Sequence, residues 1–186
     1  MPWGHLAFGY VLVSLFTRIV AGRPPRDREA AVVLLATQLP DLVDKPLSWG
    51  LSLYPTGYGA AHSVFVAGPV LVAVVAYGIE KRSLPALAFP VAYFSHLAGD
   101  VLVALVDGAP NALGRVLWPL SSFPSYAHDR GFVGRTVYYL GRFAHELADP
   151  AMLAWVAAYL LALAAVFALW VYDGTPGTGL VRALGR

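Results

Sequence analysis

Long apolar runs separated by short polar stretches dominate this chain, and their lengths predict membrane-spanning helices. A helix that crosses a bilayer needs about 20 mostly apolar residues. The runs at 60–79 and 151–172 come close to or reach this length without a charged residue. The run at 84–106 reaches it with only His96 and Asp100 as ionisable groups. We expect all of these runs to cross the membrane.

Two earlier runs are less regular. The run at 5–21 is interrupted only by Arg18, whose long side chain can reach a nearby membrane surface. The run at 30–42 is short for a span, although extension to 28–44 brings it close to bilayer thickness. Pro40 should break or kink its far end, because proline removes a helical hydrogen bond. Together the runs predict an all-α bundle of about five membrane-embedded helices.

The segment at 107–150 is mixed in character and contains one amphipathic stretch. Its apolar residues recur at helical spacing, at Val133, Val137, Leu140, Ala144 and Leu147. We expect a helix there that lies on the membrane or caps the bundle. In this interpretation residues 1–173 form one membrane-embedded domain, 108–150 is its outer-face loop, and the Gly-rich end at 174–186 is a flexible tail.

The composition excludes an ordinary soluble domain. Hydrophobic residues make up 58% of the chain and charged residues 13%, against about 25% charged residues in soluble domains. The absence of cysteine excludes thiolate nucleophiles and cysteine-ligated metal sites. The net charge is only +2 and no basic stripe runs along the chain, so we expect membrane lipids, and no nucleic acid, as partners. The oligomeric state stays open.

The distribution of basic residues predicts an orientation. If all the apolar runs cross, one side of the membrane receives Arg18, Arg23, Arg26, Arg28, Lys81, Arg82, Arg182 and Arg186. The other side receives fewer basic residues, spread over longer loops. Because short cytoplasmic loops are enriched in Lys and Arg, the first side should be cytoplasmic and the N-terminus should lie outside.

Histidines and aspartates from several runs fall at one level of this topology, toward its outer face. They are His5, Asp41, Asp44, His62, His96 and Asp100. His96 and Asp100 are four residues apart, so they share one face of their helix. Their spacing alone fits a buried ion pair and a pair of metal ligands equally well.

Imidazole and carboxylate groups suit zinc, or another divalent ion such as manganese, and a shared carboxylate can bridge two ions. The chain has no GxSxG nucleophile motif, and its GTPGTG string at residue 174 lacks the Lys of a phosphate-binding loop. Water activated by a metal is then the simplest hydrolytic mechanism open to these residues.

Four strings resemble those of the prokaryotic integral-membrane metal-dependent hydrolases, whose LexA-regulated members are best known. They are GHLAFGY at residue 4, LPDLVDKP at 39, AHS at 61 and SHLAGD at 95, and the resemblance covers about residues 1–120, including WPL at 118. The HLAGD string is also similar to the His-x-x-Gly-Asp of zinc phospholipase C and the single-strand nucleases.

The resemblance implies a set of metal ligands, namely His5, Asp41, His62, His96 and Asp100. Asp100 would bridge two ions, and Asp44 would be an alternative ligand or a general base, which makes Asp44 and Asp100 the candidate catalytic residues. The soluble enzymes carry a further His after the Gly-Asp pair. This chain lacks it, so we expect one or two ions rather than three.

Four more residues are candidates for supporting this site or closing over it. Tyr93 lies on the helix face of His96, and Ser63 follows His62 directly. His145 and Asp149 repeat the four-residue spacing on the amphipathic segment, where an exposed helical face explains them as well.

The sequence thus predicts an enzyme of the inner membrane, a metal-dependent hydrolase that cleaves a phosphoester of a lipid or lipid-linked substrate by metal-activated water. One alternative is a transporter or a proton- or cation-conducting protein that uses the buried His and Asp residues. Another is a catalytically silent membrane protein that the metal stabilises.

Overall fold

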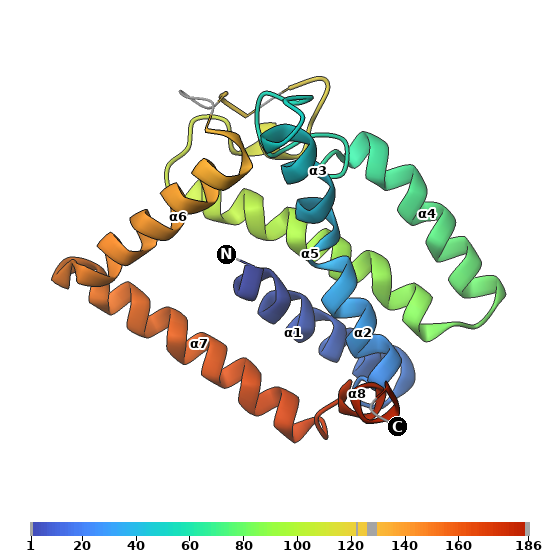
Figure 1. Cartoon of the computed structure of the whole chain (residues 1–186). Coiled ribbons are helices and arrows are strands. Elements are labelled where there is room, and N and C mark those ends of the chain that lie inside the picture. The colour runs from blue at the N-terminus through green and yellow to red at the C-terminus, as the bar shows by residue number, and fades with distance from the viewer. Residues whose placement is uncertain (1, 122, 126–129, 185–186) are drawn as a thin grey trace.

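The computed structural model of the protein describes residues 2–121, 123–125 and 130–184, and within these ranges every regular element is a helix (Figure 1). In chain order these elements are α1 (Pro2–Ala21), α2 (Asp27–Ala36), α3 (Leu39–Trp49), α4 (Val64–Glu80), α5 (Leu84–Val106), the short 3₁₀ helix η1 (Ala112–Arg115), α6 (Gly131–Ala148), η2 (Pro150–Met152), α7 (Leu153–Tyr172) and α8 (Thr178–Leu184). Helices α1, α5 and α7 are long and apolar enough to cross a membrane, and α4 is a shorter apolar helix. The expected all-α membrane bundle is confirmed.

Helix α5 is the centre of this bundle, with α1, α2 and α4 packed around it (Figure 1). The helices meet through small side chains: Ala36 of α2 and Ala88 and Ala92 of α5 have no exposed surface. Small residues let helix backbones approach closely, which favours packing inside a membrane. At Gly9 of α1 the approach is close, because a Cβ there would lie 2.3 Å from Cγ2 of Thr37.

The helix boundaries follow the sequence closely in one run and differ in another. The run at 84–106 forms α5 with the predicted bounds. The run at 60–79 becomes helical only at Val64, because the Ser63 hydroxyl caps α4 by accepting a hydrogen bond from a backbone amide of its first turn at 3.1 Å. His62 therefore lies in the loop before α4.

The second run is a broken helix. Helix α2 ends at Ala36 and α3 begins at Leu39, so the interruption lies before Pro40 and not beyond it. Proline disfavours helical backbone in the residue before it but is well tolerated in a first turn, which is where Pro40 lies in α3. In the gap, the Thr37 hydroxyl donates back to the Val33 carbonyl at 2.7 Å. The main-chain carbonyl of Thr37 is left free for a partner from another helix.

Helix α7 has no buried residue and is attached to α1 at its end. Asp173, directly after α7, accepts hydrogen bonds from the hydroxyls of Tyr10 at 2.7 Å and Ser14 at 2.8 Å, and pairs with Arg18. These partners compensate for the desolvation of a carboxylate whose side chain is fully buried. The remaining, uncovered surface of α7 is apolar and suits contact with lipid.

The amphipathic segment forms α6, as the spacing predicts. Its first half packs against α3, where the Trp49 ring contacts Phe132 and Tyr139 at centroid distances of 5.9 and 6.1 Å. The predicted apolar stripe is uncovered, with Val133 74% and Leu140 63% exposed. Such a face suits the apolar side of a membrane surface.

The C-terminal segment differs from the flexible tail that its glycines suggest. The backbone amide of Gly177 donates to Asp27 at the start of α2 at 2.6 Å, and the indole of Trp170 donates to the Pro176 carbonyl at 3.0 Å. These contacts fold the segment onto α2 and lead into α8. Glycine serves here to allow tight turns, since Gly177 has a φ of 98°.

Candidate metal centre

The predicted ligands meet where α1, α3, α5 and the loop before α4 converge. One ligand atom from each of Asp41, His62, His96 and Asp100 lies within 4.8 Å of every other. These four residues are termed the His/Asp cluster. His62 and His96 are fully buried, so the cluster is enclosed by protein on their side.

Both histidines of the cluster turn the same ring nitrogen toward it. The Nδ1 of His62 lies 2.8 Å from a carboxylate oxygen of Asp44, and the Nδ1 of His96 lies 2.6 Å from the Thr37 carbonyl. Both partners accept hydrogen bonds, so Nδ1 is the donor in each ring, and a neutral ring in this arrangement has its lone pair on Nε2. The two Nε2 atoms face each other at 3.1 Å. Imidazole nitrogens and carboxylate oxygens converge on this point, and such a set could hold a metal ion.

The distances from the two imidazole nitrogens to each other and to the two carboxylates are close to those of a tetrahedral metal site. The Nε2 of His62 lies 3.5 Å from Asp41 Oδ1 and 3.4 Å from Asp100 Oδ2. The Nε2 of His96 lies 3.7 and 3.4 Å from the same two oxygens. Zinc bonds of about 2.0–2.1 Å at tetrahedral angles separate neighbouring ligand atoms by about 3.3 Å. The residues present therefore fit a divalent ion.

Asp100 presents its two oxygens to different partners. Oδ2 faces the cluster, whereas Oδ1 lies 3.5 Å from Nε2 of His5. His5 stacks on His96 with ring centroids 4.0 Å apart. Gly99 leaves room for it, since a Cβ there would lie 3.2 Å from Nδ1 of His5. His5 thus lies next to the His/Asp cluster, on the Oδ1 side of Asp100.

Asp44 lies behind His62, outside the cluster, and its side chain is fully buried. Besides the imidazole, it accepts hydrogen bonds from the backbone amides of Gly59 at 2.8 Å, Ala61 at 3.1 Å and His62 at 2.9 Å. Lys45 pairs with Asp41 instead. With both oxygens engaged, Asp44 is placed to orient the His62 ring and the loop that carries it.

Two loops close over the cluster, and Tyr93 and Ser63 fasten them. The Tyr93 hydroxyl donates to the carbonyl of Ala61, and the Ser63 hydroxyl donates to the carbonyl of Trp118. The Val64 amide also donates to Val116, at 3.0 Å. Both candidate supporting residues thus hold the chain around His62.

Two cations flank the least buried edge of the cluster, which Asp41 and Asp100 form with side chains 14% and 12% exposed. Lys45 pairs with Asp41, and Arg115 lies 4.0 Å from Asp100 Oδ1 and donates to the Asp100 carbonyl at 2.7 Å. The Arg115 guanidinium stacks over the Phe123 ring at 4.6 Å. Among the residues that the structure describes, its buried Nε has no hydrogen-bond partner.

The other predicted pair lies elsewhere. His145 is exposed on the second half of α6 and Asp149 follows that helix, and the His/Asp cluster includes neither residue. Sequence reasoning also missed two contributors. The Thr37 carbonyl is main chain and leaves no signature, whereas Arg115 could have been noticed three residues before the WPL string at 118.

Comparison with known proteins gives one match. A family model described as YdjM inner membrane protein matches residues 1–175, which include every candidate ligand. No curated protein and no solved structure matches the chain.

Proposed function

The chain belongs to the YdjM inner membrane protein family, and from this premise we propose that it is a membrane-bound metal-dependent hydrolase that cleaves a phosphoester of a lipid or lipid-linked substrate. The observation that carries the proposal is the His/Asp cluster, in which the two imidazole Nε2 atoms lie 3.1 Å apart and 3.4–3.7 Å from oxygens of the two carboxylates. The cluster is an arrangement of acceptors that a cation completes.

Zinc is the ion that this donor set favours, with manganese as an alternative. Asp41, His62, His96 and Asp100 would hold the first ion, and His5 with Oδ1 of Asp100 would hold a second. A divalent ion there would polarise a phosphoryl oxygen and lower the pKa of a water molecule enough for it to attack phosphorus.

The chain's own residues orient this chemistry. Asp44 and the Thr37 carbonyl fix both imidazole rings with Nε2 turned inward. In hydrolysis, water adds to phosphorus as the ester P–O bond breaks, and the alcohol oxygen leaves with a proton. Asp44 is engaged by four donors, so we assign it a positioning role and not that of general base.

The charge at the edge of the cluster supports a phosphoester as the substrate class. Lys45 and Arg115 lie beside Asp41 and Asp100, the least buried carboxylates of the cluster, and cations in this position suit the oxygens of a phosphate group. The protein is an inner membrane protein by family and by its apolar helices, so a lipid or lipid-linked phosphoester would reach the site along the membrane. The distribution of Lys and Arg favours the outer face for this site.

A structural metal site is the second candidate, because four protein ligands by themselves fill a tetrahedron and leave no position for water. It predicts that the metal stabilises the fold and that no phosphoester is cleaved. Asp100 Oδ1 and His5, which extend the cluster beyond four ligands, favour the hydrolase.

The test is metal content by elemental mass spectrometry on detergent-purified protein, followed by hydrolysis assays with phospholipids and phosphodiesters. The variant is His96→Ala with Asp100→Ala. Its matched control is His145→Ala with Asp149→Ala, which removes the same residue types at the same spacing from α6. We expect one or two ions in the wild type and the control, none in the cluster variant, and hydrolysis that follows the metal.

Absence of bound metal in the wild type after reconstitution with zinc or manganese would overturn the proposal. Metal that binds, raises the melting temperature and supports no hydrolysis would assign the site to the structural alternative.

A further inference from the structure

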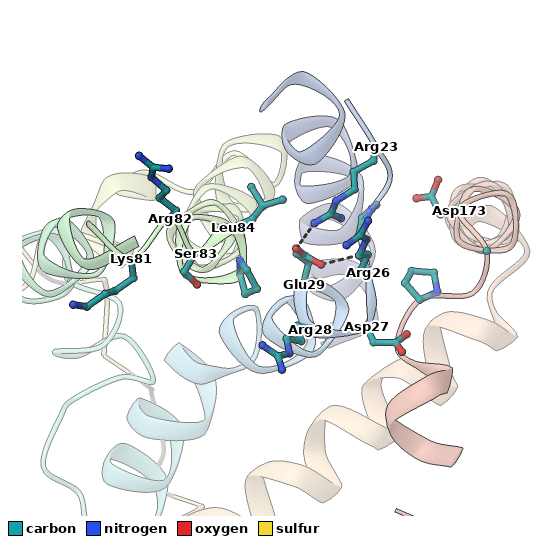
Figure 2. A pocket seen from close by; sticks show the side chains of 14 residues that line it. Arg23, Arg26, Asp27, Arg28, Glu29, Lys81, Arg82, Ser83, Leu84 and Asp173 are labelled. Atoms are coloured by element: carbon teal, nitrogen blue, oxygen red, sulfur yellow. Dashed lines mark hydrogen bonds and ion pairs between the residues drawn. The ribbon is translucent and has the colours of Figure 1, made fainter. Parts of the chain in front are cut away.

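A second polar site lies at the other end of the bundle. A hollow of about 850 Å³ opens where α1 leads into α2, α4 turns into α5 and α7 leads into α8 (Figure 2). Arg23, Arg26 and Arg28 line one side of it, and Lys81 and Arg82 line the other. We refer to it as the basic pocket.

The carboxylates that line the basic pocket form hydrogen bonds or ion pairs within the protein. Asp173 pairs with Arg18 and accepts two hydroxyls from α1. Glu29 pairs with Arg23 at 2.9 Å and accepts the Arg26 amide. Asp27 accepts the backbone amide of Gly177. The carboxylates thus hold the chain together, and the five cations of the lining still outnumber its three acids.

Three of the lining cations have no acidic partner. Among the residues that the structure describes, no ion pair joins Arg26, Arg28 or Arg82 to a carboxylate. The N-terminus of the 23-residue helix α5 also opens beside them at Ser83 and Leu84 and adds partial positive charge. Arginine forks favour the oxygens of a phosphate group.

The position of the pocket indicates where such a phosphate would come from. Candidate spans α1 and α7 end at this level, at Ala21 and Tyr172, and α5 begins there at Leu84. The ends of spanning helices lie at the depth of lipid headgroups, and basic pockets between such helices bind anionic lipids.

The basic pocket and the His/Asp cluster are separate sites. Leu84 and Asp100 are sixteen residues apart on α5, and a rise of about 1.5 Å per residue places them about 24 Å apart. Binding at one site can therefore be measured without occupancy of the other.

We propose that the basic pocket binds the phosphate of an anionic ligand, and that the ligand is the headgroup of an acidic phospholipid. Arg26, Arg28 and Arg82 grip the phosphate oxygens, while Leu84 and Pro85 contact the glycerol region. The pocket thereby fixes this end of α5 against the membrane surface.

The test compares three ligands on the purified protein in a neutral detergent: short-chain phosphatidylglycerol, short-chain phosphatidylcholine and inorganic phosphate. The pocket variant carries Arg26→Gln, Arg28→Gln and Arg82→Gln. The control carries Arg130→Gln, Arg142→Gln and Arg182→Gln, which removes equal charge outside the pocket. A third variant, with lysine at the three pocket positions, keeps the charge and loses the fork. Binding is followed by native mass spectrometry and by melting temperature.

We expect phosphatidylglycerol to bind in preference to phosphatidylcholine and to raise the melting temperature. Binding should weaken by a factor on the order of 100 in the pocket variant, less in the lysine variant, and little in the control. Metal content is measured on the same samples and should be the same in all three variants. The lipid-binding result therefore does not depend on the hydrolase proposal.

Inorganic phosphate that binds as tightly as the lipid, and is lost in the pocket variant, would support the phosphate site and assign its ligand to a soluble source. Equal binding of phosphatidylcholine, or equal loss in the control, would overturn the proposal, because the attraction would then lie outside the pocket.

Discussion

Asp44 holds His62 through one oxygen that accepts two hydrogen bonds, from the ring Nδ1 at 2.8 Å and from the backbone amide of the same residue at 2.9 Å. The ring and the main chain of His62 are therefore fixed by one carboxylate. Such a contact sets both the position of the imidazole and the nitrogen that it offers to a metal.

Asp44→Asn should weaken metal binding by about 10- to 100-fold, because the amide cannot accept all of the hydrogen bonds that the carboxylate accepts. A competition titration with a chromophoric chelator in detergent measures the affinity. The control is Asp107→Asn at the exposed end of α5, which should leave the affinity unchanged. An unaltered metal affinity in the Asp44→Asn variant would contradict the positioning role of Asp44.

Gly9→Ala should destabilise the protein by about 1–3 kcal/mol, because the added Cβ would lie 2.3 Å from Cγ2 of Thr37 and force α1 and α2 apart. Displacement of Thr37 should also loosen its bond to His96 and reduce metal affinity. Gly68→Ala in α4 is the control, since no atom lies within 4 Å of its Cβ. It should be neutral or slightly stabilising by helix propensity. Unfolding in mixed micelles measures the stability, and a metal titration measures the affinity. Equal stability of the Gly9 and Gly68 variants would contradict the close packing at Gly9.

Asp173→Asn should lower the free energy of unfolding by about 2–3 kcal/mol, because a buried charged acceptor that binds Tyr10, Ser14 and Arg18 is lost. Metal content should stay the same, since Asp173 contacts α1 away from its N-terminal end, where His5 adjoins the His/Asp cluster. The control is Glu80→Gln, which removes an acid whose side chain is 70% exposed. It should lower the free energy of unfolding only slightly. A variant that melts like the wild type would show that α7 is held by other contacts.

The same end of the bundle should lose stability in acid. Burial raises the pKa of Glu29, but hydrogen bonds from Arg23 and the Arg26 amide outweigh it and leave that pKa below its usual 4.5. Burial likewise raises the pKa of Asp173, and its bond to Arg18 brings it below the usual 3.8. A depressed folded pKa stabilises the folded state above the unfolded pKa, and this stability is lost as the pH falls through the folded value.

Melting temperatures measured between pH 7 and pH 3 should therefore fall below about pH 4.5. The fall should be smaller in the variant that combines Glu29→Gln with Asp173→Asn. A pH profile with the same slope in both proteins would assign the acid lability to other carboxylates.

Several elements follow directly from the sequence. The run at 84–106 becomes α5 without a shift, because an unbroken apolar stretch with a serine cap leaves few alternatives in a membrane. The i, i+4 spacing of His96 and Asp100 likewise predicts that both reach one point, and the structure places them there.

Other elements depend on contacts between segments that are distant in sequence. The place of the break between α2 and α3 is fixed by Thr37, whose carbonyl is bonded by His96 from a different helix. The role of Asp44 rests on amides of a loop 15–18 residues later. The sequence shows that these residues are polar, and their spacing predicts that they lie close to the site. The hydrogen bonds that the Thr37 carbonyl and the Asp44 carboxylate accept depend on tertiary packing.

The His/Asp cluster is drawn entirely from the first five helices and their loops, and α6, α7 and α8 follow it in the chain. During synthesis, Asp41 and His62 emerge before their partners on α5 do, and isolated polar groups are costly in lipid. Insertion of α5 brings the last two ligands, and the centre can be complete while α7 is still outside the membrane. In the biogenesis of this protein, the proposed metal could thus bind before α7, a helix without buried residues, reaches the membrane.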